Sequence, residues 1–171
     1  SSNTDYLTGT KATDYDVLTV QDTTIITNKS ITVTTQAAPS FTANKVGTVK
    51  IKAVTPQTTY SVSIKIGSTT QIATYTTPDS ADIDTILTDL KSDIDGWTGD
   101  FDNLTVTRLD TSLEISSTVA FTLSGKGGAD NDRLVTYQNQ VANVTTLPDR
   151  SLHNRVVKVF NTANSAQDAY Y

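Results

Sequence analysis

Cysteine and methionine are both absent from the 171 residues, and His153 is the only histidine. The lack of cysteine excludes a disulfide framework, a zinc–cysteine site and a thiol nucleophile. His153 lies in a polar stretch with no Gly-x-Ser-x-Gly motif in the chain, so we interpret it as a surface loop residue rather than a general base. The missing methionine and the opening Ser1-Ser2 favour a piece of a longer chain.

Positive charge, aromatic residues and long apolar runs are also scarce. The 13 lysines and arginines stand against 18 aspartates and glutamates, so the formal charge is -5 and the pI is about 4.6. A nucleic-acid-binding face needs clustered basic residues, which this composition does not favour. The longest apolar runs have only a few residues, far short of the ~20 that cross a bilayer, so we expect no membrane partner.

Threonine dominates what is present, with valine, isoleucine and serine in support. Threonine and valine favour the half-buried surface of a pleated sheet. Every acidic residue is aspartate except Glu114. Aspartate suits turns and helix starts, whereas glutamate suits helix interiors. The composition therefore predicts a β-rich protein with many turns.

Alternating apolar and polar residues predict strands along most of the chain. Three runs between residues 46 and 77, around Val49–Ala53, Val62–Ile66 and Ile72–Ala73, predict an antiparallel meander. Lysines at positions 50, 52 and 65 would point outward and protect a sheet edge. Further strands are expected at 17–21, 23–27, 28–36 (with Ile31 and Val33 inward), 104–108, 113–115, 119–123 and 156–159, with an ambiguous, mainly extended stretch at 135–144. Residues 37–45 are interpreted as a linker or long loop, and 147–154 as a loop.

The period changes to that of a helix in residues 79–95. One stripe carries five apolar residues, Ile83, Ile86, Leu87, Leu90 and Ile94. Pro78 suits the first turn, and Gly96 is predicted to end the helix in a left-handed conformation. Together these patterns predict an α+β, β-rich fold of antiparallel sheets with one packed amphipathic helix.

The stretch "GKGGADNDRL" (125–134) is close to the glycine- and aspartate-rich turns of calcium-binding β-rolls. Such turns need tandem copies that share each ion, and this chain has one copy. Asp130 also stands where the pattern requires a third glycine. Asp130 and Asp132 could hold an ion weakly through oxygen ligands. A glycine turn after a strand ending at Leu123 is the favoured interpretation, and no metal site is predicted.

Four pairs of aspartates spaced two apart are candidate hydrolase carboxylates: Asp14/Asp16, Asp82/Asp84, Asp93/Asp95 and Asp100/Asp102. Glycoside hydrolysis needs two carboxylates about 5–10 Å apart across a cleft, one with a raised pKa. Sequence spacing supplies neither condition, so solvated turns and helix caps are favoured. Trp97 could stack on a sugar or a partner, but it is expected to close the end of the core beneath the helix. We predict no catalytic, cofactor-binding or metal-binding residue.

The order of these pieces resembles a family. "DVLTVQDTTIITNKSITV", the strand pair "TVKIKAVTPQTTYSVSIKIG", the helix "IDTILTDLKSDI", "TTLPDRSLHNRVVKVF" and "NSAQDAYY" follow one another as in the tail nozzle proteins of short-tailed phages, also called tail tubular protein B. The resemblance covers almost all of residues 6–171 and lies in order and spacing rather than in one motif.

The resemblance implies a structural role in the virion tail. Such nozzles are homohexamers that form the tube through which phage DNA leaves, dock on a tail adaptor ring and lie near the tail fibres. Residues 1–36 would then hold strands of the platform region of the parent chain, and residues 37–171 an α+β module. No catalytic residue, metal or cofactor carries over. An acidic, polar wall would let DNA pass without specific binding. A tail-associated glycan hydrolase and a carbohydrate-binding surface module stay open as alternatives.

Overall fold

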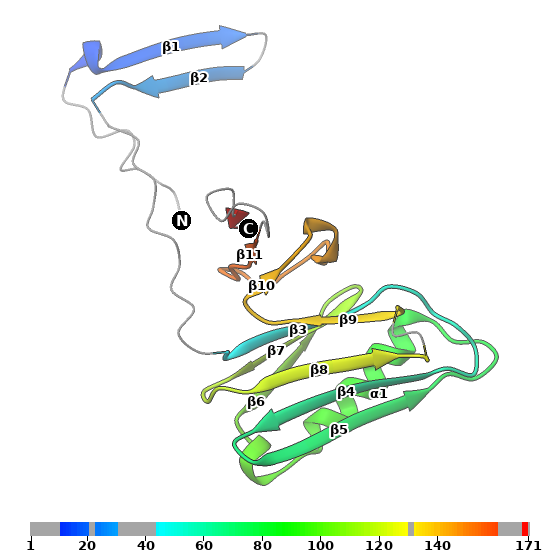
Figure 1. Cartoon of the computed structure of the whole chain (residues 1–171). Coiled ribbons are helices and arrows are strands. Elements are labelled where there is room, and N and C mark those ends of the chain that lie inside the picture. The colour runs from blue at the N-terminus through cyan, green and yellow to red at the C-terminus, as the bar shows by residue number, and fades with distance from the viewer. Residues whose placement is uncertain (1–10, 21–22, 31–43, 130–131, 161–168, 171) are drawn as a thin grey trace. The chain divides into compact units, whose positions relative to one another are not determined.

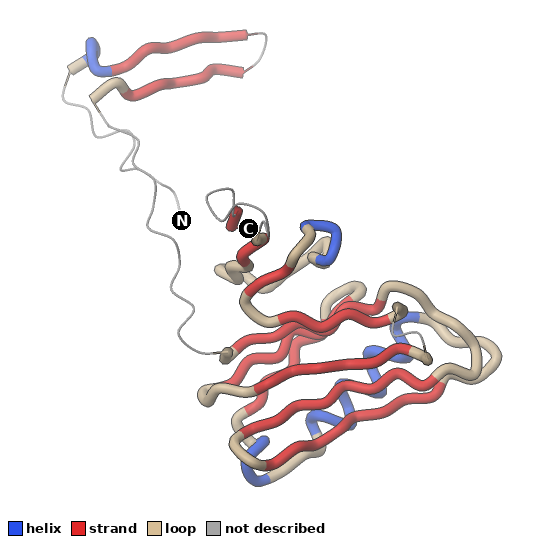
Figure 2. The backbone as a smooth tube through the Cα atoms, viewed as in Figure 1, coloured by secondary structure: helices blue, strands red, loops and turns tan. Residues whose placement is uncertain are grey.

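The computed structural model describes residues 11–20, 23–30, 44–129, 132–160 and 169–170. The chain divides into two compact units, a first unit of Ser1–Ala38 and a second unit of Pro39–Tyr171. Strands dominate the described residues, and the sheets of the second unit pack with one α-helix of that part of the chain (Figures 1 and 2). The predicted β-rich α+β class is confirmed.

The first unit contains an antiparallel hairpin. A short 3-10 turn, η2 (Ala12–Asp14), leads into β1 (Tyr15–Val20), which pairs with β2 (Thr23–Asn28). These strands match the two predicted at 17–21 and 23–27. The predicted strand with Ile31 and Val33 lies outside the described residues. The assignment of residues 1–36 to a platform region, and of 37–171 to a separate module, stays a prediction.

Two antiparallel sheets form the body of the second unit. One has the strand order β6-β7-β3-β9 and the other β5-β4-β8. The two sheets come together where β8 lies against β9. The strands are β3 (Val46–Ile51), β4 (Thr59–Ile66), β5 (Thr69–Thr76), β6 (Leu104–Arg108), β7 (Ser112–Ser117), β8 (Thr122–Gly127) and β9 (Leu134–Tyr137).

Helix α1 (Ile83–Asp95) closes the side of the core away from β8 and β9. It contacts β5 and β6, the outer strands of the two sheets. Its buried stripe consists of Ile86, Leu87, Leu90 and Ile94, with Ile83 half-buried, as the spacing predicts. After α1, a 3-10 turn, η3 (Gly99–Phe101), buries Phe101 in the same core.

The predicted end of the helix at Asp95 is confirmed, but its predicted start and the predicted left-handed conformation of Gly96 are wrong. The helix begins after Asp82 rather than at Asp79, because the Asp82 side chain accepts a hydrogen bond from the Thr85 backbone N–H (2.7 Å) and caps the first turn. Gly96 ends the helix in a right-handed conformation (φ -80°) and donates to the Ser92 and Asp93 carbonyls. The glycine is therefore not required there by a positive φ.

The predicted meander is wrong as well. Strands β4 and β5 pair, but β3 pairs with β7 and β9, which come much later in the chain. Consequently Lys50 on β3 and Lys65 on β4 lie on central strands and protect no edge. Lys52 follows the end of β3. The outer strand β5 is covered instead by α1, since Asp93 of the helix accepts from the Thr74 N–H (3.1 Å).

The C-terminal segment folds over the outer face of the four-stranded sheet. It contains β10 (Gln140–Val141), the 3-10 turn η4 (Val144–Thr146), β11 (Lys158–Val159) and β12 (Ala169–Tyr170), which form a small mixed sheet. Lys50 of β3 donates from Nζ to the backbone carbonyls of Thr145 (3.2 Å) and Leu147 (2.7 Å). The predicted strand at 156–159 is thus shorter than expected, and residues 147–154 lie outside helices and strands, as predicted.

Candidate functional site

The glycines of "GKGGADNDRL" serve close packing rather than an ion. Strand β8 continues to Gly127, so the predicted strand end at Leu123 is wrong, and the turn begins at Gly128 (φ +80°). A Cβ on Gly125 would lie 2.5 Å from a methyl of Leu134, and a Cβ on Gly127 would lie 2.8 Å from the Leu134 backbone nitrogen. The absence of side chains at these two positions lets β8 approach β9.

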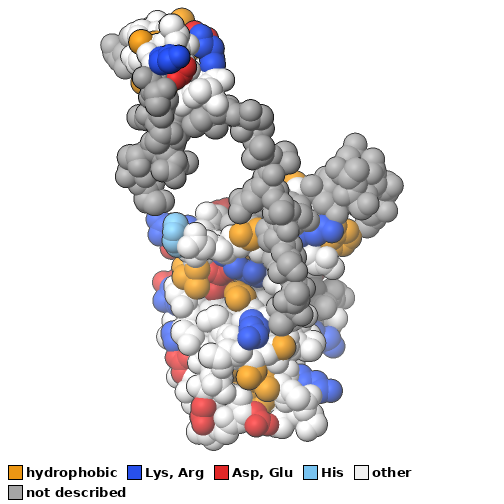
Figure 3. Space-filling model, turned by 90° about the vertical axis from the view of Figure 1, so that its left-hand side faces the viewer, with side chains coloured by type: hydrophobic (Ala, Val, Ile, Leu, Met, Phe, Trp, Pro, Cys, Tyr) orange, Lys and Arg blue, Asp and Glu red, His pale blue; other side chains and the backbone are white. Residues whose placement is uncertain are grey.

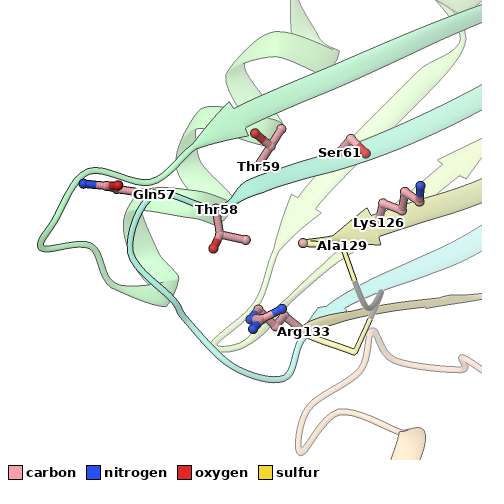
Figure 4. Close-up of a pocket in the computed structure, with 8 residues that line it drawn as sticks. Gln57, Thr58, Thr59, Ser61, Lys126, Ala129 and Arg133 are labelled. Atoms are coloured by element: carbon pink, nitrogen blue, oxygen red, sulfur yellow. The ribbon is translucent and has the colours of Figure 1, made fainter.

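A polar hollow of about 500 Å³ lies beside this stretch (Figure 4). Hydroxyl and amide groups line it together with two cationic residues, Lys126 and Arg133. Arg133 donates from Nε to Thr55 Oγ1 (2.7 Å) and from Nη1 to Asp132 Oδ1 (3.1 Å). Lysine and arginine side chains repel a calcium ion, and the described carboxylate of this stretch is already paired with arginine. The geometry therefore favours a structural turn.

Asp130 lies outside the described residues, so the prediction that it belongs to a structural turn is not tested. Among the residues that are described, no group of three or more His, Cys, Asp or Glu side chains converges to hold a metal ion. The same part of the chain contains no helix with the length and apolar character needed to cross a bilayer.

The four aspartate pairs form no paired-carboxylate site. The side chains of all these aspartates except Asp102 have separate partners along the chain, and Asp102 takes part through its backbone N–H, which donates to the Gly99 carbonyl. Asp14 accepts from the Lys11 N–H, Asp16 pairs with Lys29, Asp82 caps α1, Asp84 pairs with Arg108, Asp93 binds the Thr74 N–H, Asp95 pairs with Lys91, Asp100 accepts from Thr69, and Asp102 follows η3 as its C-cap. Asp82 is a helix cap, as the sequence favours, whereas Asp16, Asp84 and Asp95 lie within a strand or the helix and form ion pairs instead.

Capping the helix changes the pKa of the Asp82 carboxylate. Hydrogen bonds from the backbone and side chain of Thr85 stabilise the ionised form and lower the pKa of Asp82. A general acid needs the opposite shift, toward neutrality. Asp82 is consequently suited to capping a helix and unsuited to donating a proton to a leaving group.

His153 and Trp97 lie as the sequence predicts. His153 is exposed and borders a hollow of about 330 Å³ together with Leu152, Asn154 and Arg155. Trp97 is half-buried, packs against the main core and meets the Phe101 ring edge-on, with ring centroids 5.4 Å apart. Every aromatic ring whose exposure is described is buried or half-buried, so this part of the chain presents no exposed ring on which a sugar could stack.

The feature that the sequence reasoning missed is a buried ion pair. Glu114 on β7 is fully buried and lies 3.3 Å from Nε of Arg155, whose side chain is only 7% exposed. Glu114 also accepts from the Leu152 N–H (2.6 Å) and the Ser151 hydroxyl (3.3 Å). The pair fastens the C-terminal segment to the four-stranded sheet. The signal available beforehand was that Glu114 is the single glutamate of the sequence.

Burial shifts the pKa of two groups at this ion pair, Arg155 and Tyr137. Desolvation lowers the pKa of Arg155, and the neighbouring Glu114 charge opposes that shift. Desolvation also raises the pKa of Tyr137, the β9 residue whose ring is buried beneath the same segment. The raised pKa keeps the Tyr137 hydroxyl protonated at neutral pH, and the Glu114 charge favours the ionised form of Arg155.

Four of the eight exposed large hydrophobic residues in the described part of the chain lie on the β1–β2 hairpin. Val17, Leu18, Ile25 and Ile26 are 63%, 59%, 52% and 43% exposed. Hydrophobic side chains lie at the surface of this hairpin in Figure 3. Such patches on soluble proteins mark contact surfaces.

Two packed antiparallel sheets, aspartates that cap and form ion pairs, and an exposed apolar β1–β2 hairpin define a β-rich structural module. A family model described as bacteriophage nozzle protein matches residues 1–171, and the chain belongs to this family. It is a structural component of the phage tail nozzle in the virion. A search of curated proteins found no match.

Proposed function

We propose that this chain forms part of the wall of the tube through which phage DNA leaves the virion, as one subunit of a homohexamer built by the longer parent chain. The observation that carries the proposal is the match of the nozzle family along the whole of residues 1–171. In this arrangement the assembly docks on the tail adaptor ring and lies near the tail fibres.

The surface chemistry supports a passive conduit. The chain carries a formal charge of -5, which disfavours retention of DNA phosphates. Acidic and basic side chains are interspersed over the face shown in Figure 3, without a continuous basic track. DNA would therefore pass along such a wall without specific binding.

The proposal also assigns the chain no catalytic activity. The aspartates that could form a hydrolytic pair are engaged separately in caps and ion pairs, and the described aromatic rings are buried or half-buried. A tail-associated glycan hydrolase requires a carboxylate-lined cleft, and a carbohydrate-binding module requires exposed rings around a groove.

Electron microscopy of the full-length parent and of intact tails tests the structural role. We expect sixfold rings in the parent and density for this chain in the tube wall. A monomeric parent, or density only in a peripheral spike, would contradict the proposal. Incubation with host polysaccharide tests the alternatives: release of reducing ends that is abolished in an Asp84→Ala or Asp100→Ala variant would establish a hydrolase, and saturable binding without cleavage would establish a carbohydrate-binding module.

A further inference from the structure

The outer face of the four-stranded sheet has the chemistry of a surface that faces water. Five neighbouring residues on this face are polar: Thr48, Lys50, Ser112, Glu114 and Tyr137. The residues that alternate with them along the strands point into the main core, where aliphatic side chains gather. Antiparallel sheets are commonly apolar toward the core and polar toward solvent. The packing of the two sheets and α1 therefore does not require cover on this outer face.

Residues 139–160, which we call the strap, nevertheless cover this face (Figure 1). They are held to it by polar contacts. Lys50 Nζ binds two backbone carbonyls of the strap, and Glu114 binds Arg155 and the Leu152 N–H. Such contacts exchange for contacts with water when the strap leaves, so their loss costs less than the loss of apolar burial.

The apolar contacts of the strap are separate from the main core. Val141 and Val157 form a second cluster with Leu147 and Val159 half-buried against it, and Tyr137 joins it from β9. Regular structure in the strap is short, since β10 and β11 have two residues each and η4 has three. Segments with few buried apolar contacts open at a lower free energy than the core of a protein.

The docked strap also leaves polar atoms unsatisfied. Among the described residues, the buried hydroxyls of Thr48, Ser112 and Tyr137 make no hydrogen bond of ordinary geometry. A buried polar group without a partner destabilises the arrangement that buries it, because water would satisfy the group in the open arrangement. These hydroxyls therefore favour release of the strap.

The charges of the sheet face can pair with each other once the strap has left. The register sets Thr48 opposite Glu114 and Lys50 opposite Ser112, so Lys50 and Glu114 are diagonal neighbours on one face. Diagonal neighbours lie about 7–8 Å apart, and long side chains reach across that distance. Lys50 and Glu114 thus have partners in both arrangements, while Arg155 enters water with the strap. Release leaves no buried charge without a counter-charge.

We propose that the strap is a conformational switch: it releases from the four-stranded sheet as one piece while the two sheets and α1 stay folded. The released chain presents a polar sheet face that carries Lys50 and Glu114, and the docked chain conceals it. The inference does not depend on the proposed function, because it concerns contacts within the second unit of one chain.

Native-state hydrogen exchange of the 171-residue chain tests the release. The Leu152 N–H binds Glu114, and the Phe160 N–H binds the Val141 carbonyl. We expect these strap amides to share one opening free energy and to exchange about a hundredfold faster than the amides of β4. Equal protection and equal urea dependence in the strap and in β4 would show that the strap opens only in global unfolding. Unrelated rates among the strap amides would show fraying instead of release as one piece, and either result would overturn the proposal.

Two single-cysteine variants provide a second test, since the natural sequence has no cysteine. Thr48 and Val49 are adjacent on β3 and both fully buried, but Thr48 lies beneath the strap and Val49 lies in the main core. We expect a thiol reagent to modify Thr48→Cys about tenfold faster than Val49→Cys, after correction for the urea stability of each variant.

Ile86→Val, a change in the main core, separates the two routes of opening. It should speed the modification of Val49→Cys several-fold, because it weakens the core that only global unfolding breaks. The modification rate of Thr48→Cys should stay the same, since docked and released chains contain the same core. Equal rates for the two cysteines, or equal acceleration of both by Ile86→Val, would contradict an independent release. The exchange measurement on the natural chain decides the matter where a cysteine variant does not fold.

Discussion

At the residue scale, Gly127 has no space for a methyl group. Its Cβ would lie 2.8 Å from the Leu134 nitrogen and 3.1 Å from the Arg133 carbonyl carbon, both backbone atoms that move only with their strand. We expect Gly127→Ala to lower the free energy of unfolding by about 1–3 kcal/mol, as overpacking does in well-packed interiors. Urea denaturation followed by circular dichroism measures the change.

Gly96→Ala is the matched control for that substitution. At Gly96 the nearest atom to an added Cβ is 3.4 Å away, which is ordinary contact, and the backbone is right-handed. We expect no loss, or a small gain from the lower entropy of the unfolded chain. If both variants lose the same stability, close packing of β8 on β9 is not the reason for the glycine.

Glu114 is the second position where one side chain decides a local structure. Glu114→Ala would leave Arg155 buried without its counter-charge, and breaking such pairs costs about 3–5 kcal/mol. We expect a large drop in unfolding free energy and faster protease cleavage within residues 147–157. Limited proteolysis with mass spectrometry locates the cut.

Two further variants separate the ion pair from simple loss of packing. In Glu114→Leu/Arg155→Met both charges are removed, so the double variant should be more stable than Glu114→Ala. Asp110→Ala removes a carboxylate from an exposed pair with Arg150 and should change little. Equal proteolysis of all three variants would refute the fastening role of Glu114.

At the scale of elements, the Asp82 cap determines where helix α1 begins. Asp82→Ala removes the oxygen that accepts from the Thr85 N–H, so we expect the melting temperature to fall by a few degrees. Asp79→Ala is the control, since Asp79 accepts from the Gln57 side chain outside the helix. A larger effect at Asp79 than at Asp82 would contradict the observed helix start.

The cap also predicts a dependence on pH. Because its folded pKa is lowered, Asp82 contributes stability that is present above its unfolded pKa of about 3.9 and is lost as the pH falls through the folded value. Asp82→Asn keeps an oxygen at the cap but cannot ionise. The difference in melting temperature between natural chain and Asp82→Asn should therefore shift in favour of the variant below about pH 4. A constant difference would show that the charge has no part.

At the scale of the whole molecule, calcium should have no effect on stability. A ligand that binds only the folded state raises the melting temperature by mass action. We expect the same melting temperature with chelator and with millimolar calcium, and nearly silent Asp130→Ala and Asp132→Ala variants. A rise of several degrees with calcium, lost in either variant, would show that residues 125–134 form an ion site. Magnesium at the same concentration controls for ionic strength.

The local features were predictable because they depend on neighbours in the chain. The apolar stripe of α1 and the existence of strands β1, β2, β6 and β7 follow from spacing alone. The pairing of β3 was not predictable, because an alternating pattern identifies a strand but not the strands with which it pairs. The exact start of α1 was also missed, since Asp79, Asp82 and Asp84 are all acceptable near a helix N-terminus and only the cap hydrogen bond selects among them.

Composition, periodicity and the order of the pieces are enough to define the class of the protein: its β-rich α+β composition, the face that the helix buries, and the ordered pieces that mark a nozzle protein. Tertiary structure alone decided which strands pair, why glycines stand at 125 and 127, and that Glu114 meets Arg155 from 41 residues away (155 minus 114). The physical reason is that periodicity records which side of an element is buried. Long-range pairing depends instead on the shape and charge of surfaces that meet only after the chain has folded.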